Sequence, residues 1–213
     1  MSNGAATEPG SAPIAARSPR GGATRARLLE AAVELLEVGG YSAASVTAVA
    51  SRAGVASGAL YRHFSSKASL FVEVFRTMAE GKLAALREAG AGADTALEKL
   101  DAVVTEFAGG ALAKPRLAWA LVYEPVDAAV DAERLAYRQT YREHLSTLLE
   151  EGIAAGEIPE QDAELSVAAL IGAINEALVA PLSPVGPKVD PAETVAALLA
   201  FCRRAVGAPP DAV

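Results

Sequence analysis

The chain has 213 residues, of which 52% are apolar and 21% are charged, a composition typical of a globular protein with a buried core. Its single cysteine, Cys202, excludes an internal disulfide and a metal site built from a cysteine cluster. No run of apolar residues approaches the ~18 of a membrane span. No long apolar stretch follows the N-terminal arginines either, so we expect a cytoplasmic protein without an export signal or a membrane partner.

The net charge of −7 is divided unevenly along the chain. Residues 1–82 contain nine Lys and Arg against six Asp and Glu, a net +3, whereas residues 83–213 contain ten against twenty, a net −10. A small basic part followed by a larger acidic part indicates that only the first part binds a polyanion. Charge runs are more often solvated faces, so this indication needs the support of a motif.

The first predicted elements are three helices separated by glycines. Thr24 is a suitable cap for a helix whose apolar residues recur at helical spacing and which stops at Gly39–Gly40. Ser45 is a suitable cap for a short second helix, which Gly54 ends. A third helix is predicted over about 57–63.

The rest of the chain is also predicted to be helical. Ser66 is the expected cap of a long fourth helix over 66–89, and Gly90–Gly92 forms its boundary with the next. Prolines and glycines then separate further predicted helices at roughly 94–110, 115–123, 127–155, 162–181 and 191–206. No strand-like alternation persists, so the fold class is predicted to be all-α.

Residues 45–67 have the pattern of a helix-turn-helix motif. Two short helices pack closely only where small residues meet, and Ala50, Ala53 and Gly54 satisfy that requirement. Ser57, Gly58 and Ala59 keep the outward face of the following helix small, which lets its backbone approach a groove of DNA. The cluster Tyr61-Arg62-His63 adds donors for phosphates and base edges. An ordinary surface hairpin is the alternative interpretation of this pattern.

The segments Thr24-Arg25-Ala26-Arg27-Leu28-Leu29, Gly40-Tyr41 and Ser45 to Lys67 resemble the DNA-binding domain of TetR-family transcriptional regulators. The stretch AGVASGALYRHFSSK carries the resemblance most strongly, and the whole covers about residues 24–75. The resemblance implies a homodimer on a palindromic operator in double-stranded DNA, with a small-molecule effector, of unknown identity, bound in the C-terminal domain. The implied function is transcriptional regulation, most often repression that the effector relieves.

By this resemblance nine residues are expected to contact DNA, whereas Leu60 and Phe64 face the core. The nine are Ser45, Thr47, Ser57, Gly58, Ala59, Tyr61, Arg62, His63 and Lys67. Lys67, at the start of the fourth helix, is expected to hold a phosphate there. Position 56 is Ala where the family usually has a capping Ser or Thr, so Ser57 is an alternative cap. Ala59 lacks the hydroxyl often found at its position, which places base readout there in doubt.

The resemblance also implies a division of the chain. We expect a disordered tail over 1–22, a helix-turn-helix domain over 23–68, an effector-binding and dimerisation domain over 69–207, and a tail over 208–213. The helix at 66–89 joins the two domains. Dimerisation is expected through the helices at about 162–181 and 191–206, whose apolar stripes suit a four-helix bundle, although an intramolecular core would show the same stripes.

The effector pocket is expected among the aromatic and polar residues of the middle helices, because pockets combine an apolar lining with a few polar groups. The candidates are Phe107, Trp119, Tyr123, Glu124, Arg134, Tyr137, Arg138, Tyr141 and Asn175, with Trp119 and Tyr123 first among them. Core packing and a solvated, salt-bridged face remain the alternatives for each. For Asn175 a contact across the dimer, a place in the pocket and a bond to a backbone carbonyl all remain open.

No motif supports catalysis, and neither histidine has metal-ligand spacing, so we predict no enzyme activity, no cofactor and no metal. The main alternative is a DNA-binding regulator without a small-molecule effector, controlled by its abundance or by a protein partner. A packed interior in the acidic domain would favour that alternative. A ligand-binding protein that has lost DNA binding is a third possibility, against which the retained Tyr61, Arg62 and Lys67 argue.

Overall fold

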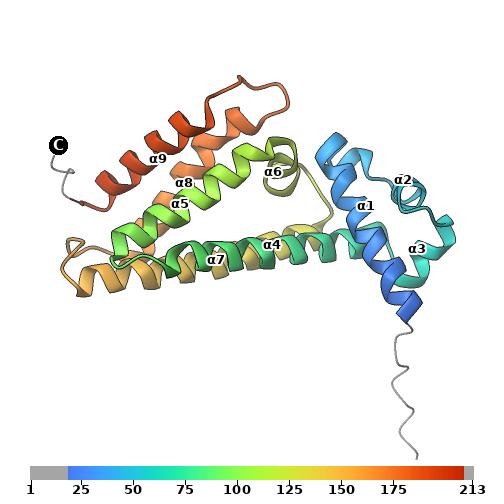
Figure 1. Ribbon diagram of the computed structural model, residues 1–213, viewed down its shortest axis with the longest axis horizontal. Coiled ribbons are helices and arrows are strands. Elements are labelled where there is room, and N and C mark those ends of the chain that lie inside the picture. The colour runs from blue at the N-terminus through green and yellow to red at the C-terminus, as the bar shows by residue number, and fades with distance from the viewer. Residues whose placement is uncertain (1–18, 209–213) are drawn as a thin grey trace, which may run out of the picture.

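The computed structural model of the protein describes residues 19–208, and within that range the chain forms nine helices and no strand (Figure 1). The predicted all-α fold is therefore confirmed. The helices are α1 (Pro19–Ala43), α2 (Val46–Arg52), α3 (Ser57–His63), α4 (Lys67–Ala91), α5 (Ala96–Ala113), α6 (Pro115–Val122), α7 (Ala128–Ala154), α8 (Ala163–Leu182) and α9 (Pro191–Ala205).

The start of α1 differs from the prediction. The helix begins at Pro19, so Thr24 lies inside it and does not cap it, and residues 19–22 are helical rather than part of a disordered tail. The rest of the predicted tail, residues 1–18, lies outside the described residues, as do residues 209–213. Glycine disfavours a helix by only ~1 kcal/mol per residue, which does not end a helix that packing anchors downstream.

The helix-turn-helix motif follows its predicted local chemistry at three of its four ends. Gly40 (φ 70°) and Gly54 (φ 65°) adopt the left-handed backbone that interrupts α1 and ends α2. The Ser45 hydroxyl accepts a bond of 3.1 Å from the Ala48 N–H, as expected of a cap. Ser57, the alternative cap of α3, does not cap it, because Ala56 occupies the cap position and offers no side-chain acceptor.

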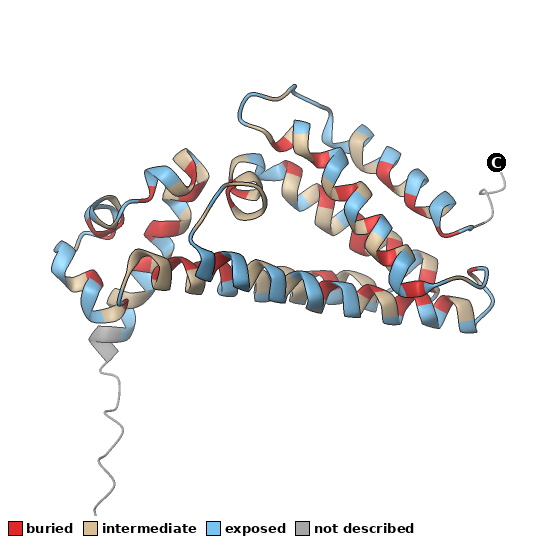
Figure 2. Ribbon diagram, turned by 180° about the vertical axis from the view of Figure 1, so that it is seen from behind, coloured by how far each residue is buried: buried red, intermediate tan, exposed pale blue. Residues whose placement is uncertain are grey.

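Two hydrophobic cores hold the molecule together, and the division between them does not coincide with the expected domain boundary. One core is formed by residues of α1, α2, α3 and α4. It includes Leu28, Leu60 and Phe64, and the burial of Leu60 and Phe64 was predicted. Leu117 on α6 and Val130 on α7 are buried in this same core. The other core is formed by buried residues of α4, α5, α7, α8 and α9 and of the segment after α7, and Figure 2 shows the buried stretches along these helices. We call α1 to α3 the first domain and α4 to α9 the body. The body therefore packs against the first domain through α6 and α7 as well as through α4.

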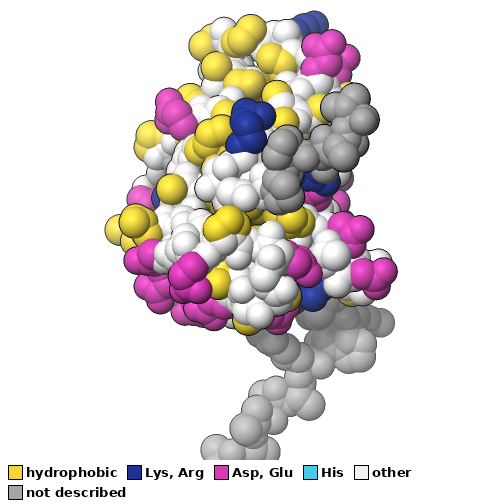
Figure 3. All heavy atoms as spheres, turned by 90° about the vertical axis from the view of Figure 1, so that its left-hand side faces the viewer, with side chains coloured by type: hydrophobic (Ala, Val, Ile, Leu, Met, Phe, Trp, Pro, Cys, Tyr) yellow, Lys and Arg dark blue, Asp and Glu magenta, His cyan; other side chains and the backbone are white. Residues whose placement is uncertain are grey.

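Helix α8 is the one helix within the described range whose length and composition would allow it to cross a membrane, although Glu164 and Glu176 interrupt its apolar residues. In the fold it contributes Val167, Leu170, Ile174 and Leu178 to the core of the body. Its outer face stays uncovered, and Leu165 is 67% exposed. Figure 3 shows the face of the body that lies on the left in Figure 1. Apolar side chains are spread over the upper part of this face, whereas acidic side chains gather over its lower part.

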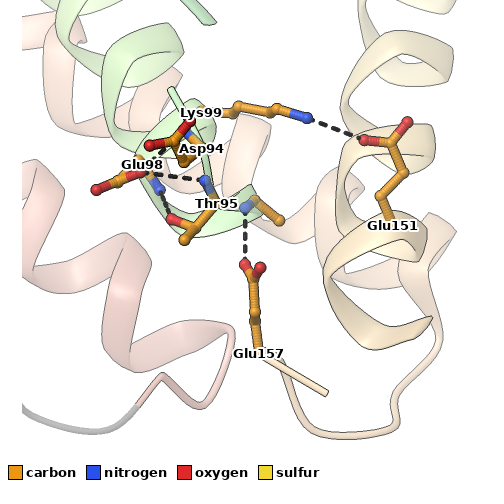
Figure 4. Close-up of polar contacts among 7 residues, drawn as sticks. Asp94, Thr95, Glu98, Lys99, Glu151 and Glu157 are labelled. Atoms are coloured by element: carbon orange, nitrogen blue, oxygen red, sulfur yellow. Dashed lines mark hydrogen bonds and ion pairs between the residues drawn. The ribbon is translucent and has the colours of Figure 1, made fainter. Parts of the chain in front are cut away.

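The end of the body farthest from the helix-turn-helix motif is closed by contacts of the start of α5 with the end of α7 and the segment that follows it (Figure 4). Thr95 and Glu98 form a reciprocal capping box, which satisfies backbone N–H groups at the start of α5. The Glu157 carboxylate accepts a bond of 2.7 Å from the Ala96 N–H. Lys99 Nζ lies 3.4 Å from Glu151 Oε2. Both side chain–backbone hydrogen bonds and an ion pair therefore hold this end of the body together.

Gly152 near the end of α7 allows this close approach. A Cβ placed on Gly152 would lie 2.7 Å from Ile158 Cδ1 and 2.8 Å from Ala96 Cβ. We expect Gly152→Ala to lower the free energy of unfolding by about 1 kcal/mol, because overpacking of ~1–3 kcal/mol outweighs the gain in helix propensity of ~1 kcal/mol.

Gly81→Ala in α4 is the matched control for this change, because a Cβ there meets nothing within 4 Å. It is expected to raise the free energy of unfolding by ~0.5–1 kcal/mol. Urea denaturation of the two variants measures both effects. Equal stabilisation by both substitutions would contradict the packing that we describe around Gly152.

Candidate functional site

Helix α3 presents a small, polar outer face. Ser57, Gly58, Tyr61 and Arg62 are exposed, and the Tyr61 side chain is 58% exposed. Ala59 and His63 are half-buried on the same short helix. A Cβ placed on Gly58 would meet nothing within 4 Å, so a larger residue would fold here but would hold the helix away from a groove. Ser45 and Thr47 are exposed at the start of α2.

Most arginines of the first domain are engaged within the protein. Arg25 pairs with Glu73 and lies over the Phe64 ring, 5.1 Å from its centroid. Arg27 donates to the Ala53 carbonyl, and Arg52 pairs with Glu34. Arg62, by contrast, is exposed and makes no hydrogen bond or ion pair within residues 19–208. Its guanidinium is therefore available to a phosphate or a base edge.

Lys67 is already engaged with the first domain at the start of α4. Its ammonium donates a bond of 3.0 Å to the Tyr41 carbonyl and lies 4.0 Å from the centroid of the Tyr41 ring. Burial lowers the pKa of Lys67, and the nearby Asp127 carboxylate opposes that shift. Sequence reasoning did not foresee these contacts. A phosphate contact by Lys67 remains a prediction, and it would use the ammonium donors that Tyr41 leaves open.

Tyr41 also joins the end of α1 to the loop between α6 and α7. Its backbone N–H donates a bond of 2.6 Å to Glu124 Oε2, and its hydroxyl donates to Asp127. Asp127 precedes α7 but makes no side-chain capping bond, because its carboxylate accepts from Tyr41 instead. Glu124 in turn pairs with Arg116 on α6. Gly40 has a φ of 70°, which favours glycine at this junction, and a Cβ there would also displace the ends of the Arg116 and Glu124 side chains.

A cavity of about 270 Å³ lies inside the body, between α4, α5, α6, α7 and α8. Seven of the nine predicted pocket residues line it, namely Phe107, Tyr123, Arg134, Tyr137, Arg138, Tyr141 and Asn175. Four of these lie on α7 at positions i, i+3, i+4 and i+7, which puts them on one face of a helix. Burial raises the pKa of Tyr137 to about 12, so its hydroxyl stays protonated.

The other two predicted pocket residues do not line the cavity. Trp119 packs against the core of the body, with its ring centroid 5.0 Å from that of Tyr123. Glu124 is held by Arg116 and by the Tyr41 N–H. Sequence spacing did not show which residues of α6 face the cavity, because Leu117, Ala118, Trp119, Leu121 and Val122 are all apolar or aromatic.

Sequence reasoning missed two lysines in the cavity wall. Lys82 Nζ on α4 lies 2.9 Å from Glu106 Oε1 and donates to the Glu106 carbonyl. Lys114, between α5 and α6, lies 2.7 Å from Glu37 Oε1 on α1. Neither lysine is near an aromatic cluster in sequence, so no local pattern marked it.

Arg134 connects the cavity wall to the loop that holds Tyr41. Its Nη1 donates a bond of 2.8 Å to the Glu124 carbonyl, and its Nη2 donates a bond of 2.8 Å to the Ala120 carbonyl. On the opposite wall, the Tyr123 hydroxyl donates a bond of 2.6 Å to the Asn175 carbonyl, and the Asn175 amide bonds the Ile171 carbonyl. Two of the three alternatives for Asn175 are therefore both found, since the residue lines the cavity and its side-chain amide donates a hydrogen bond to a backbone carbonyl.

In the part of the chain that the structure describes, no group of three or more His, Cys, Asp and Glu side chains is placed to hold a metal ion. Cys202 is fully buried, and burial raises the pKa of its thiol to about 11. The structure thus contains an exposed helix α3, a cavity inside the body, and between them a set of polar contacts around Tyr41.

Two family models match the chain. Residues 28–74 match "Bacterial regulatory proteins, tetR family", and residues 93–179 match "Tetracyclin repressor-like, C-terminal domain". The two matches cover the helix-turn-helix domain and the part of the body that contains most of the cavity.

Similar proteins of known role are regulators. The chain is 28% identical over 153 residues to the fatty acid metabolism regulator protein of Bacillus subtilis (strain 168), covering 70% of this chain and 79% of that protein. It is 32% identical over 136 residues to the transcriptional repressor KstR2 of Rhodococcus jostii (strain RHA1), covering 62% and 66% respectively. The crystal structure of FadR from Bacillus subtilis in complex with stearoyl-CoA is similar with a TM-score of 0.74 and 25% identity, covering 83% of this chain and 96% of that one.

Proposed function

Because this chain belongs to the TetR family of bacterial regulatory proteins and is a DNA-binding transcriptional regulator, we propose that it is a repressor whose effector is a coenzyme A thioester of a fatty acid. The observation that carries the proposal is the cavity of about 270 Å³, which has a largely apolar wall and basic side chains. Its volume is close to the lower end of the ~300–1,000 Å³ of ligand sites. A narrow acyl chain suits such a space, and the solved relative with stearoyl-CoA supports this ligand class.

If the protein were a DNA-binding regulator that responds to no small molecule, we would expect the interior of the body to be fully packed. The cavity argues against that alternative, because native cores contain few voids larger than a water molecule. The largely apolar wall further favours a hydrophobic ligand over a small polar one.

The repressor acts as a homodimer through α8 and α9. Leu165 on α8 and Phe201 on α9 are 67% and 41% exposed in the single chain, and covering such side chains is what a two-fold helical interface does. In this dimer the two copies of α3 enter successive major grooves about 34–36 Å apart. Ser45, Thr47, Ser57, Gly58, Ala59, Tyr61, Arg62, His63 and Lys67 are the residues that we propose for the DNA interface.

The effector changes the spacing of the two reading helices by a population shift. An acyl chain in the cavity disturbs Arg134, which holds the Glu124 and Ala120 carbonyls. The Glu124 side chain holds the Tyr41 N–H, and the Tyr41 carbonyl holds Lys67 at the start of α4. The ligand therefore acts on the first domain through the α6–α7 loop in addition to α4.

Trp119 supplies a direct assay of ligand binding, because it is the only tryptophan in the chain and packs against cavity-lining Tyr123. Titration with acyl-CoA thioesters from lauroyl-CoA to stearoyl-CoA is expected to change its fluorescence saturably, with micromolar or tighter Kd. Coenzyme A alone, which lacks the acyl chain, is the control and is expected to cause no saturable change. If no thioester of the series binds, the proposed effector class is wrong.

A further inference from the structure

The cavity wall carries four basic side chains, Lys82, Lys114, Arg134 and Arg138, and none of the lining residues is a carboxylate. This composition contrasts with the acidic surroundings, since residues 83–213 carry a net charge of −10. Positive charges beside a low-dielectric wall attract an anion more strongly than they do in open water. The cavity is thus electrostatically suited to a molecule with an apolar body and an anionic group.

Three of the four cations are already engaged. Lys82 is bound to Glu106, and Lys114 pairs with Glu37. Arg134 holds two backbone carbonyls and lies 3.1 Å from Asp131. Each of these would have to give up a partner to bind a ligand anion, which offsets much of what the new contact contributes.

Arg138 differs from the other three. It is exposed, it lines the cavity one turn after Arg134 on the same face of α7, and it makes no ion pair or hydrogen bond within residues 19–208. Burial raises the pKa of Tyr123, and the charge of Arg138 opposes that shift, so Arg138 acts on the wall formed by the end of α6. Because Arg138 is exposed and also lines the cavity, it lies where the cavity meets solvent.

We infer that Arg138 binds the anionic head group of the ligand at the mouth of the cavity and so selects charged amphiphiles over neutral lipids. This inference rests on the proposed function, because it assigns a role within the same effector site. The apolar wall holds the acyl chain, and Arg138 pairs with a phosphate or a carboxylate that stays near water. Both anions suit the planar guanidinium, which forms two parallel hydrogen bonds with either.

The test uses the full chain and the fluorescence of Trp119, with three probes of one chain length: lauroyl-CoA, laurate and the neutral dodecanol. Arg138→Gln removes the charge, and Arg138→Lys keeps it without the planar fork. Arg142→Gln is the matched control, because Arg142 is exposed one turn further along α7 and does not line the cavity. Thermal unfolding confirms that each variant is folded.

We expect Arg138→Gln to raise the Kd of at least one anionic probe about fivefold at low salt, since an exposed ion pair contributes modestly. Dodecanol binding should stay unchanged, Arg142→Gln should match the wild type, and added NaCl should weaken the anionic probe less in Arg138→Gln than in the wild type. An effect on lauroyl-CoA alone identifies phosphate as the anion, and an effect that includes laurate identifies carboxylate.

Two results would overturn the inference while leaving the acyl effector intact. One is unchanged binding of both anionic probes to Arg138→Gln, and the other is equal weakening of all three probes, which indicates a structural role. A wild-type protein that binds none of the probes would overturn the proposed effector and the inference together.

Discussion

Replacing Arg62 by alanine is expected to weaken binding of the dimer to its operator about a hundredfold at a fixed salt concentration. Each contact of this kind contributes ~1–3 kcal/mol, and a symmetric dimer loses it twice. Arg62 makes no hydrogen bond or ion pair within residues 19–208 and is exposed, so we expect the substitution to leave the fold unchanged. Fluorescence anisotropy of a labelled DNA fragment, over a salt series, measures the loss.

Arg52→Ala is the matched control for Arg62→Ala. Arg52 belongs to the same motif and is also exposed, but it is paired with Glu34 on α1. We expect this variant to bind the operator within a few-fold of the wild type. An equal loss for both variants would indicate a general charge effect, and no loss for Arg62→Ala would remove Arg62 from the interface. A reduced salt slope for Arg62→Ala would identify its contact as a phosphate.

Replacing Glu124 by glutamine is expected to uncouple the effector from the operator. In the wild type we expect saturating acyl-CoA to weaken operator binding between about fivefold and 150-fold, the usual range of allosteric coupling. In Glu124→Gln this factor should fall below about threefold, because the bond from the Tyr41 N–H loses its charge and the pair with Arg116 is broken. Effector binding without DNA should persist, because Glu124 does not line the cavity.

Glu143→Gln provides the control for this uncoupling, since Glu143 is exposed and, within residues 19–208, its carboxylate accepts a bond only from Gln139 on its own helix. It should show the wild-type coupling factor. Coupling is reciprocal, so operator DNA should weaken effector binding by the same factor in each variant. A normal coupling factor in Glu124→Gln would exclude the α6–α7 loop as the route and leave α4 alone.

Local sequence patterns predicted much of the fold because local chemistry sets where many of the helices begin and end. Ser45 and Ser66 each cap the helix that the sequence assigned to them, and Gly40 and Gly54 adopt the left-handed backbone that their positions require. Thr24 failed as a start signal because α1 continues through weak helix formers to Pro19. A capping residue marks where a helix is able to begin, and packing decides whether it does.

The site was predictable where one helix supplies it. Arg134, Tyr137, Arg138 and Tyr141 share one face of α7, so helical spacing brought them together correctly. Lys82 reaches the same cavity from α4, and nothing in its neighbourhood shows that α4 and α7 are packed side by side. Glu124 was assigned to the pocket for its charge among aromatics, whereas its partner Tyr41 is 83 residues away in sequence. Long-range partners of this kind are absent from any local pattern.

The most direct test of the account is the anisotropy of the DNA upstream of the gene, or of a sequence selected from a random pool, titrated with the protein in the presence and absence of acyl-CoA. We predict tight, salt-sensitive binding that lauroyl-CoA to stearoyl-CoA weakens at the concentrations that change Trp119 fluorescence. Thioesters that bind the body and leave operator affinity unchanged would contradict it. The protein would then be a DNA-binding regulator whose cavity serves another purpose.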